Sequence, residues 1–223
     1  MSHAALMDRI YRFQRHFYDT TRRFFLLGRD ALVGRMDLED GDRVLEMGCG
    51  TARNLIGLAK RNPGTRLYGL DASDQMLATA RTKVRRKGFD RIDLRQCLAE
   101  DLDHQDTFGL HEPFDAIFFS YALTMMPSCL DALDAALRNL KPGGSIYIVD
   151  FWDQRDLPWA FRSLLKKWLR LFHVVHRPEV MSHLEILASA GKGELHLEPV
   201  ARRYAYIARF TTSDPRPQEA NCA

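Results

Sequence analysis

The sequence predicts an α/β protein with a doubly wound, mostly parallel sheet of seven strands and helices on both faces. From residue 43 onward, short apolar runs alternate with helical patterns, and right-handed crossovers place the intervening helices on both faces of such a sheet. Glycine-rich or acidic residues follow the first strands, where sheets of this type bind ligands. The 223 residues are 46% hydrophobic and 27% charged, which is typical of one globular domain with a real core.

Turn residues and apolar runs locate the elements of the first two thirds of the chain. Residues 7–33, rich in arginine and aromatic side chains, are predicted to form one helix. Strands are predicted at 43–47, 66–70, 92–97, 114–119 and 145–151. The helices between them are predicted at 54–61, 73–87 and 130–140, ending before Asn62-Pro63-Gly64, at Gly88 and before Lys141-Pro142-Gly143-Gly144.

The last third is predicted to end the sheet with an antiparallel pair. Helices at 158–172 and 178–190 precede strands at 195–199 and 204–210, which a short turn joins. The last strand therefore runs antiparallel to the others. Three regions follow: a helical lid over residues 1–36, the main domain over residues 37–211, and a loose polar tail over residues 212–223.

Several classes of protein are excluded by composition. No apolar run reaches the ~18 residues of a membrane-spanning helix, and Met1–Asp8 does not resemble a signal peptide, so a cytoplasmic protein is expected. The four cysteines are scattered and form no Cys-x-x-Cys pair. A disulfide framework, a zinc site and any other metal centre are therefore not expected.

The net charge of +3 hides two basic segments, 9–35 and 155–177. Residues 155–177 carry six Lys or Arg against one Asp, and such segments indicate an anionic partner. Between 158 and 172 an apolar stripe is flanked by Arg162, Lys166 and Arg170. Two readings stay open: an anionic membrane surface on the cytoplasmic side, which this helix would touch peripherally, or packing of the stripe on the sheet.

The turn after the first strand and the acid after the second predict a nucleoside-binding site. The turn reads Glu46-Met47-Gly48-Cys49-Gly50, and Asp71 lies 23 residues beyond Gly48. Its carboxylate can accept hydrogen bonds from both hydroxyls of a ribose. Arg53 stands where a dinucleotide fingerprint needs glycine, and Glu46 would repel a pyrophosphate but could hold an ammonium group.

These segments resemble the class I S-adenosylmethionine-dependent methyltransferases and their Rossmann-like fold. Val44–Thr51 is similar to their first motif, Leu70–Leu77 to their ribose motif, and Leu140–Gly144 to the turn before strand five. The resemblance implies that S-adenosylmethionine is the cofactor. The implied binding residues are Arg29, Glu46, Gly48, Cys49, Gly50, Asp71, Ala72, Met76, Ala99, Glu100 and Ser120. Leu98 departs from the family's usual acid, so Ala99 or Glu100 is expected near the adenine, and Arg29 could instead be a plain surface residue.

A second resemblance concerns the acceptor. Tyr11–Arg22, Phe119–Pro127 and Val149–Phe151 are similar to bacterial betaine-lipid N-methyltransferases, which convert diacylglycerylhomoserine to diacylglyceryl-trimethylhomoserine. This implies a lipid amine substrate and allows an association with the enzyme that makes diacylglycerylhomoserine. Tyr121, Tyr18 and Tyr11 are the candidate catalytic residues, because they could orient the amine or stabilise its cationic product. Helix packing by Tyr11 and Tyr18 is an equal alternative.

Other acceptors remain as alternatives at this stage. Phosphatidylethanolamine, ornithine lipid or a soluble small amine would suit the same cofactor site. An RNA methyltransferase is disfavoured, because the chain has no Asn/Asp-Pro-Pro-Tyr motif and no appended RNA-binding module. No nucleic-acid partner is therefore predicted.

Overall fold

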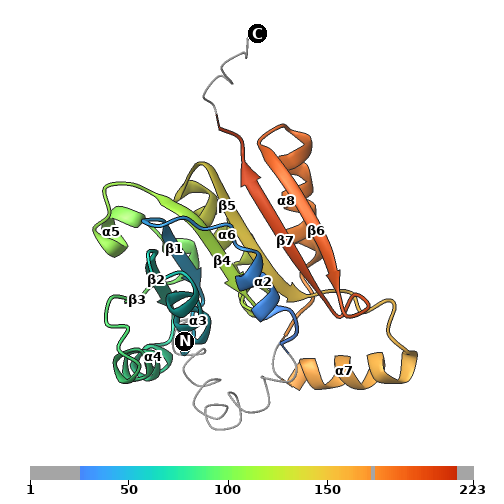
Figure 1. Ribbon diagram of the computed structural model, residues 1–223. Helices are drawn as coiled ribbons and strands as arrows, with labels where there is room; N and C mark the ends of the chain where they lie inside the picture. The colour runs from blue at the N-terminus through green and yellow to red at the C-terminus, as the bar shows by residue number, and fades with distance from the viewer. Residues whose placement is uncertain (1–25, 172–173, 215–223) are drawn as a thin grey trace.

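The computed structural model describes residues 26–171 and 174–214 and confirms the predicted sheet (Figure 1). The strand order is β3-β2-β1-β4-β5-β7-β6. The first five strands pair in parallel, whereas β7 is antiparallel to both β5 and β6. Their bounds are β1 Arg43–Met47, β2 Arg66–Asp71, β3 Asp93–Gln96, β4 Phe114–Ser120, β5 Leu140–Phe151, β6 Gly193–Val200 and β7 Ala205–Thr212. This is the Rossmann-like methyltransferase fold.

Helices cover both faces of the sheet. Residues of α2, α3, α4 and α7 share one apolar cluster with alternate residues of the central strands, and residues of α5, α6 and α8 share the other. The bounds are α2 Arg29–Arg35, α3 Arg53–Arg61, α4 Asp74–Arg86, α5 His104–Phe108, α6 Cys129–Arg138, α7 Trp159–Leu171 and α8 Pro178–Ser189. None of the helices in the described ranges is both long enough and apolar enough to cross a membrane.

The central strands are mainly apolar because both faces of the sheet are buried. In β4, Ala116 and Phe118 belong to one cluster and Ile117 and Phe119 to the other. The start of α4 follows local capping chemistry. The Ser73 hydroxyl accepts a hydrogen bond from the Met76 N–H (3.3 Å) and so fixes where α4 begins, beside the end of β2.

The predicted single helix over 7–33 is wrong in its described part. Residues 26–28 are not helical, and Gly28 adopts a left-handed conformation (φ 86°) before α2 begins at Arg29. A Cβ atom at Gly28 would lie 3.3 Å from Val149 and 3.4 Å from Val200, so the chain passes close to the sheet there. The rest of that prediction, residues 7–25, lies outside the described residues.

The turn predicted at 141–144 is part of β5, which begins at Leu140. The register shifts from the Phe114–Leu140 pair to the Ala116–Ser145 pair, so these residues bulge out of the ladder. Three short elements were not predicted: α5 and the 3₁₀ turns Ala99–Asp101 and Leu123–Met125. At the C-terminal end, β7 includes Thr212, which the sequence places in the tail.

Candidate active site

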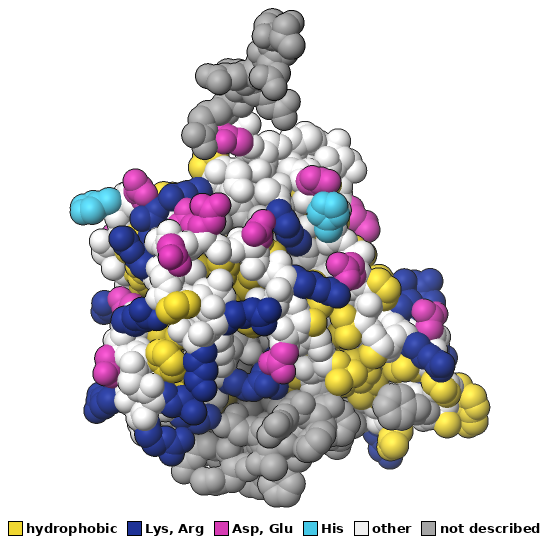
Figure 2. Space-filling view, viewed as in Figure 1, with side chains coloured by type: hydrophobic (Ala, Val, Ile, Leu, Met, Phe, Trp, Pro, Cys, Tyr) yellow, Lys and Arg dark blue, Asp and Glu magenta, His cyan; other side chains and the backbone are white. Residues whose placement is uncertain are grey.

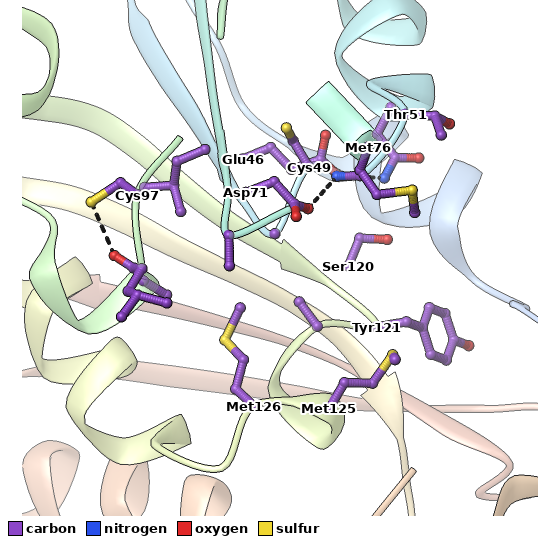
Figure 3. Close-up of a pocket in the computed structure, with 18 of the residues that line it drawn as sticks. Glu46, Cys49, Thr51, Asp71, Met76, Cys97, Ser120, Tyr121, Met125 and Met126 are labelled. Carbon is purple, nitrogen blue, oxygen red and sulfur yellow. Dashed lines mark hydrogen bonds between the residues drawn. The ribbon is translucent and has the colours of Figure 1, made fainter. Parts of the chain in front are cut away.

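A cavity that is open to solvent lies at the carboxyl ends of β1, β2 and β4 (Figure 3). Its walls also come from residues after β3, from the loop after β4 and from the segment that leads into α2. This is the edge of a doubly wound sheet at which ligands bind.

The glycine-rich turn forms the floor of the cavity. Gly48 and Gly50 have positive φ angles of 74° and 52°, a conformation that favours glycine. The N–H groups of Gly48 and Cys49 both donate to the Leu70 carbonyl at 2.9 Å, which joins the turn to β2. A Cβ atom at Gly48 would lie 2.9 Å from the Cβ of Ala122. Only glycine therefore lets the loop after β4 approach the turn this closely.

Asp71 ties the turn to the start of α4. Its Oδ2 accepts a hydrogen bond from the Gly50 N–H at 2.8 Å, and its Oδ1 accepts one from the Ser73 N–H at 2.9 Å. These bonds fix the rotamer of a nearly buried carboxylate at the cavity wall. Each carboxylate oxygen can accept a second hydrogen bond, so the geometry suits the two hydroxyls of a ribose.

Glu46 is buried at the end of β1, and its two oxygens differ. Oε1 accepts a hydrogen bond from the Asn54 side-chain amide at 2.6 Å, whereas Oε2 has no hydrogen-bond partner among the described residues. Burial raises the pKa of Glu46 to about 8, against a smaller opposing effect of the Asn54 hydrogen bond and the Arg29 charge. A buried carboxylate oxygen at a cavity wall is suited to bind a cationic group, such as the ammonium of an amino acid.

The part of the cavity that is lined by α4 and by the turn after β3 is mainly apolar. Met76 is buried in the first turn of α4. Its Cε lies 3.7 Å from the position that a Cβ atom on Gly50 would occupy. Ala99 is buried and Glu100 half-buried, at the start of the 3₁₀ turn that follows β3. Leu98 lines the cavity beside them. A thioether and an aliphatic side chain at this end suit the faces of a planar base.

Tyr121 lines the cavity, but its hydroxyl is directed away from it (Figure 3). The hydroxyl donates a hydrogen bond to the Leu27 carbonyl, and the ring packs edge-on against Phe151, 4.7 Å away. Burial raises the pKa of the Tyr121 phenol well above its usual value. In this arrangement Tyr121 fastens the segment before α2 to the end of β4.

The loop after β4 is held by a buried carboxylate. Asp150 accepts hydrogen bonds from the Thr124 hydroxyl at 2.6 Å and from the Thr124 N–H at 3.1 Å. Met125 and Met126, the next two residues, line the cavity. Asp150 therefore positions the methionine side of the site without contacting its interior.

All eleven residues that the sequence analysis assigned to the cofactor line this one cavity. Tyr18 and Tyr11 lie outside the described residues. Several lining residues were not predicted from the sequence, among them Leu26, Asn54, Met125 and Met126. The paired methionines lie in the loop after the fourth strand, which ends at Ser120, and this position could have marked them. No local pattern indicates the contact of Asn54 with Glu46.

The comparisons with known proteins agree with this geometry. The family model described as "Methyltransferase domain" matches residues 38–201. A demethylmenaquinone methyltransferase of Geobacillus kaustophilus is 31% identical over 170 residues, which cover 76% of this chain and 66% of that protein. The one from Bacillus subtilis is 32% identical over 55% of this chain and 51% of its own length. The chain thus matches about half to two thirds of the length of these relatives.

Solved structures show the same fold at low sequence identity. A methyltransferase in complex with the Trm112 methyltransferase activator of Haloferax volcanii superposes with a TM-score of 0.71 at 15% identity, over 92% of this chain and 97% of that one. Phosphoethanolamine N-methyltransferase 2 of Haemonchus contortus, with S-adenosyl-L-methionine, gives 0.64 at 17% identity, over 84% and 52%. With the family model matching most of its length, the chain belongs to the class I S-adenosylmethionine-dependent methyltransferases.

Proposed function

We propose that the protein transfers methyl groups from S-adenosylmethionine to a lipid amine, and that the amine is that of diacylglycerylhomoserine, giving the trimethylated betaine lipid. The proposal is supported by the likeness of three segments, Tyr11–Arg22, Phe119–Pro127 and Val149–Phe151, to betaine-lipid N-methyltransferases. The cofactor half of the cavity, with Asp71 and Glu46, is the part common to the family.

The observation that carries the amine assignment is the chemistry of the second half of the cavity. Tyr121, Met125 and Met126 lie across the cavity from Glu46 and Asp71 (Figure 3), and Leu26 and Ala122 complete an apolar wall. Apolar surroundings disfavour the charged form of a titratable group. They lower the pKa of an amine, so the amine stays neutral and its lone pair is available for methylation. They raise the pKa of a phenol, so its oxygen stays protonated.

The reaction asks little of the protein beyond placement. When bound, the cofactor supplies an electrophilic methyl group on a sulfonium. Asp71 would hold the ribose of the cofactor and Glu46 would hold its ammonium group. The apolar wall would exclude water from the reacting atoms. The amine nitrogen forms the new N–C bond as the S–C bond breaks and the bonding electrons go to sulfur. After the first and second transfers the nitrogen loses a proton to solvent, and after the third it keeps a permanent positive charge. Arg29, at the cavity wall, could pair with a carboxylate of the cofactor or of the homoserine headgroup.

A second candidate acceptor is demethylmenaquinone. The specific observation in its favour is that the curated relatives at 28–32% identity carry the name demethylmenaquinone methyltransferase. Both acceptors are amphiphiles that reside in membranes. They differ in the reacting atom, which is nitrogen in one and ring carbon in the other.

Purified protein with isotope-labelled S-adenosylmethionine separates the candidates. Diacylglycerylhomoserine, phosphatidylethanolamine and demethylmenaquinone would be offered in parallel in mixed micelles, and the products identified by mass spectrometry. We expect label in the mono-, di- or trimethylated homoserine lipid. Label only in menaquinone would replace the proposal with the second candidate, and label only in phosphatidylethanolamine would move the amine to another lipid.

A further inference from the structure

The helix α7 leaves more apolar surface exposed than its packing uses. Leu165 and Leu169 are buried in the cluster on one face of the sheet. Trp159 at the start of the helix is 78% exposed, Leu164 is 67% exposed, and Val175 just beyond the helix is 51% exposed. Of the five large hydrophobic residues that are exposed in the described part of the chain, these are three.

Cationic side chains surround this surface. Residues 155–177 carry a net charge of +5, although the whole chain carries only +3. Lys167 is exposed and Arg162 partly exposed within the helix itself. Figure 2 shows hydrophobic side chains gathered at this projecting corner of the molecule with Lys and Arg beside them. Exposed tryptophan and leucine within a basic segment match the chemistry of an anionic bilayer interface.

The two ends of α7 are fastened at different places, one to the turn between β6 and β7 and the other to the loop after β4. Before the helix, the Gln154 N–H donates to the Arg203 carbonyl at 3.0 Å, and the Arg203 Nε donates to Asp153 at 2.9 Å. After it, the Val175 N–H donates to the Thr124 carbonyl at 3.0 Å. Thr124 precedes Met125 and Met126, which line the cavity. Val175, one of the exposed residues, is therefore hydrogen-bonded to the residue that precedes the two cavity-lining methionines.

The position of α7 fits this connection. In Figure 1 it lies beyond the edge of the sheet at which the parallel strands end, which is also the edge that carries the cavity. A bilayer that contacts α7 would lie beside the cavity. An amphiphilic acceptor could then present its headgroup to the site while its chains stay in the membrane.

We propose that α7 and Val175, an exposed residue that follows it, form a docking surface for an anionic lipid bilayer, in which Trp159 and Leu164 enter the interface and Arg162 and Lys167 contact acidic headgroups. This docking does not depend on which amphiphile is methylated.

The test is co-sedimentation of the full-length protein with vesicles of phosphatidylcholine alone or of phosphatidylcholine mixed with phosphatidylglycerol. We expect binding to the anionic vesicles only, weakened by salt because headgroup attraction is screened. Trp159→Ser with Leu164→Ser should lower the partition coefficient about tenfold, and Arg162→Glu with Lys167→Glu by about as much.

The chain offers matched controls. Ile186 on α8 is 67% exposed, the same fraction as Leu164, so Ile186→Ser is the matched control for Leu164→Ser made alone. Lys192→Glu reverses an exposed charge in the turn after α8. Both controls should bind as the unaltered protein does, and all variants should keep their melting temperature and cofactor affinity.

Three results would overturn the proposal. The unaltered protein could fail to bind anionic vesicles, or bind neutral and anionic vesicles equally. Alternatively, the α7 variants could bind as well as the two controls, which would place membrane contact in another segment or assign the α7 surface to a protein partner.

Discussion

Asp71 does two things with one carboxylate. Its oxygens fix the Gly50 and Ser73 N–H groups, and the same atoms face the cavity. The glycine-rich turn and the start of α4 are thus positioned by the group that would also bind the ribose. A substitution at Asp71 removes the hydrogen-bond acceptor for the ribose and loosens the glycine-rich turn at the same time.

We therefore expect Asp71→Ala to weaken binding of S-adenosylhomocysteine by about 1–3 kcal/mol, the cost of losing hydrogen bonds to a charged group. Isothermal titration calorimetry measures the change. Asp74→Ala is the control, because Asp74 is an acidic residue in the first turn of the same helix that does not line the cavity. Equal affinity in Asp71→Ala and the unaltered protein would remove Asp71 from the binding site.

Glu46 makes cofactor binding depend on pH. Its pKa of about 8 means that the carboxyl is protonated at neutral pH in the free protein. An ammonium group bound beside it favours the carboxylate, so binding should release a proton and strengthen as the pH rises toward 8. Calorimetry in buffers of different ionisation enthalpy detects the released proton. Glu46→Gln should release none, and an unchanged pH profile in that variant would contradict the assignment.

The same shift predicts a trend in stability without ligand. The pKa in the folded protein lies above the ordinary value of 4.5, so the unfolded chain releases this proton at lower pH. The contribution of Glu46 is therefore fully present below pH 4.5 and is lost as the pH rises through about 8. Denaturant unfolding of the free protein should show a shallower loss over this window in Glu46→Gln.

At the scale of elements, the site depends on how the segment before α2 meets the ends of β4 and β5. Gly28 lets the chain pass close to Val149, and the Tyr121 hydroxyl holds the Leu27 carbonyl. Leu26, next to this contact, lines the cavity. The contact therefore links the closing segment to the position where β4 ends.

Tyr121→Phe should test this link. The ring keeps its packing on Phe151, but the Leu27 carbonyl loses its donor, which costs about 1 kcal/mol of unfolding free energy. We expect kcat to fall while the Kd for S-adenosylhomocysteine stays nearly constant, because the acceptor side alone is loosened. Chemical denaturation and steady-state kinetics measure the two effects.

Tyr147→Phe is the control, since the Tyr147 hydroxyl accepts a hydrogen bond from the Asp37 N–H outside the cavity. Full activity in Tyr121→Phe would show that neither the hydroxyl nor the link matters for turnover.

The elements show what a single sequence can and cannot predict. The strands were recognisable because burial on both faces makes β1 and β4 mainly apolar. The break at Gly28 was not, because it arises from contact with Val149 and Val200, far away in sequence. In the site, residues directly after strands were found from topology. The contacts Asn54–Glu46 and Thr124–Asp150 depend on packing between elements and leave no local signal.

At the scale of the molecule, the cavity lies at the parallel part of the sheet. The proposed membrane surface lies on the connection that leads from this part to the antiparallel strands β6 and β7. The α7 segment lies between β5, whose neighbour β4 ends at the cavity, and α8, which precedes the β6–β7 pair. Variation in this connection can change the surface that meets the acceptor's surroundings while the cofactor half stays the same.

The strand order also governs how the chain can fold while it is being made. Because β7 lies between β5 and β6, β6 leaves the ribosome before β7, the strand with which it pairs. Until residues 205–212 emerge, the nascent chain exposes the backbone edge of β5 and an unpaired β6, both of which invite pairing with other chains. A chain stopped after Val200 should aggregate, whereas one stopped after Asp214 should fold, as sedimentation of the in vitro translation products would show. Synthesis of residues 205–212 thus decides whether the sheet is completed.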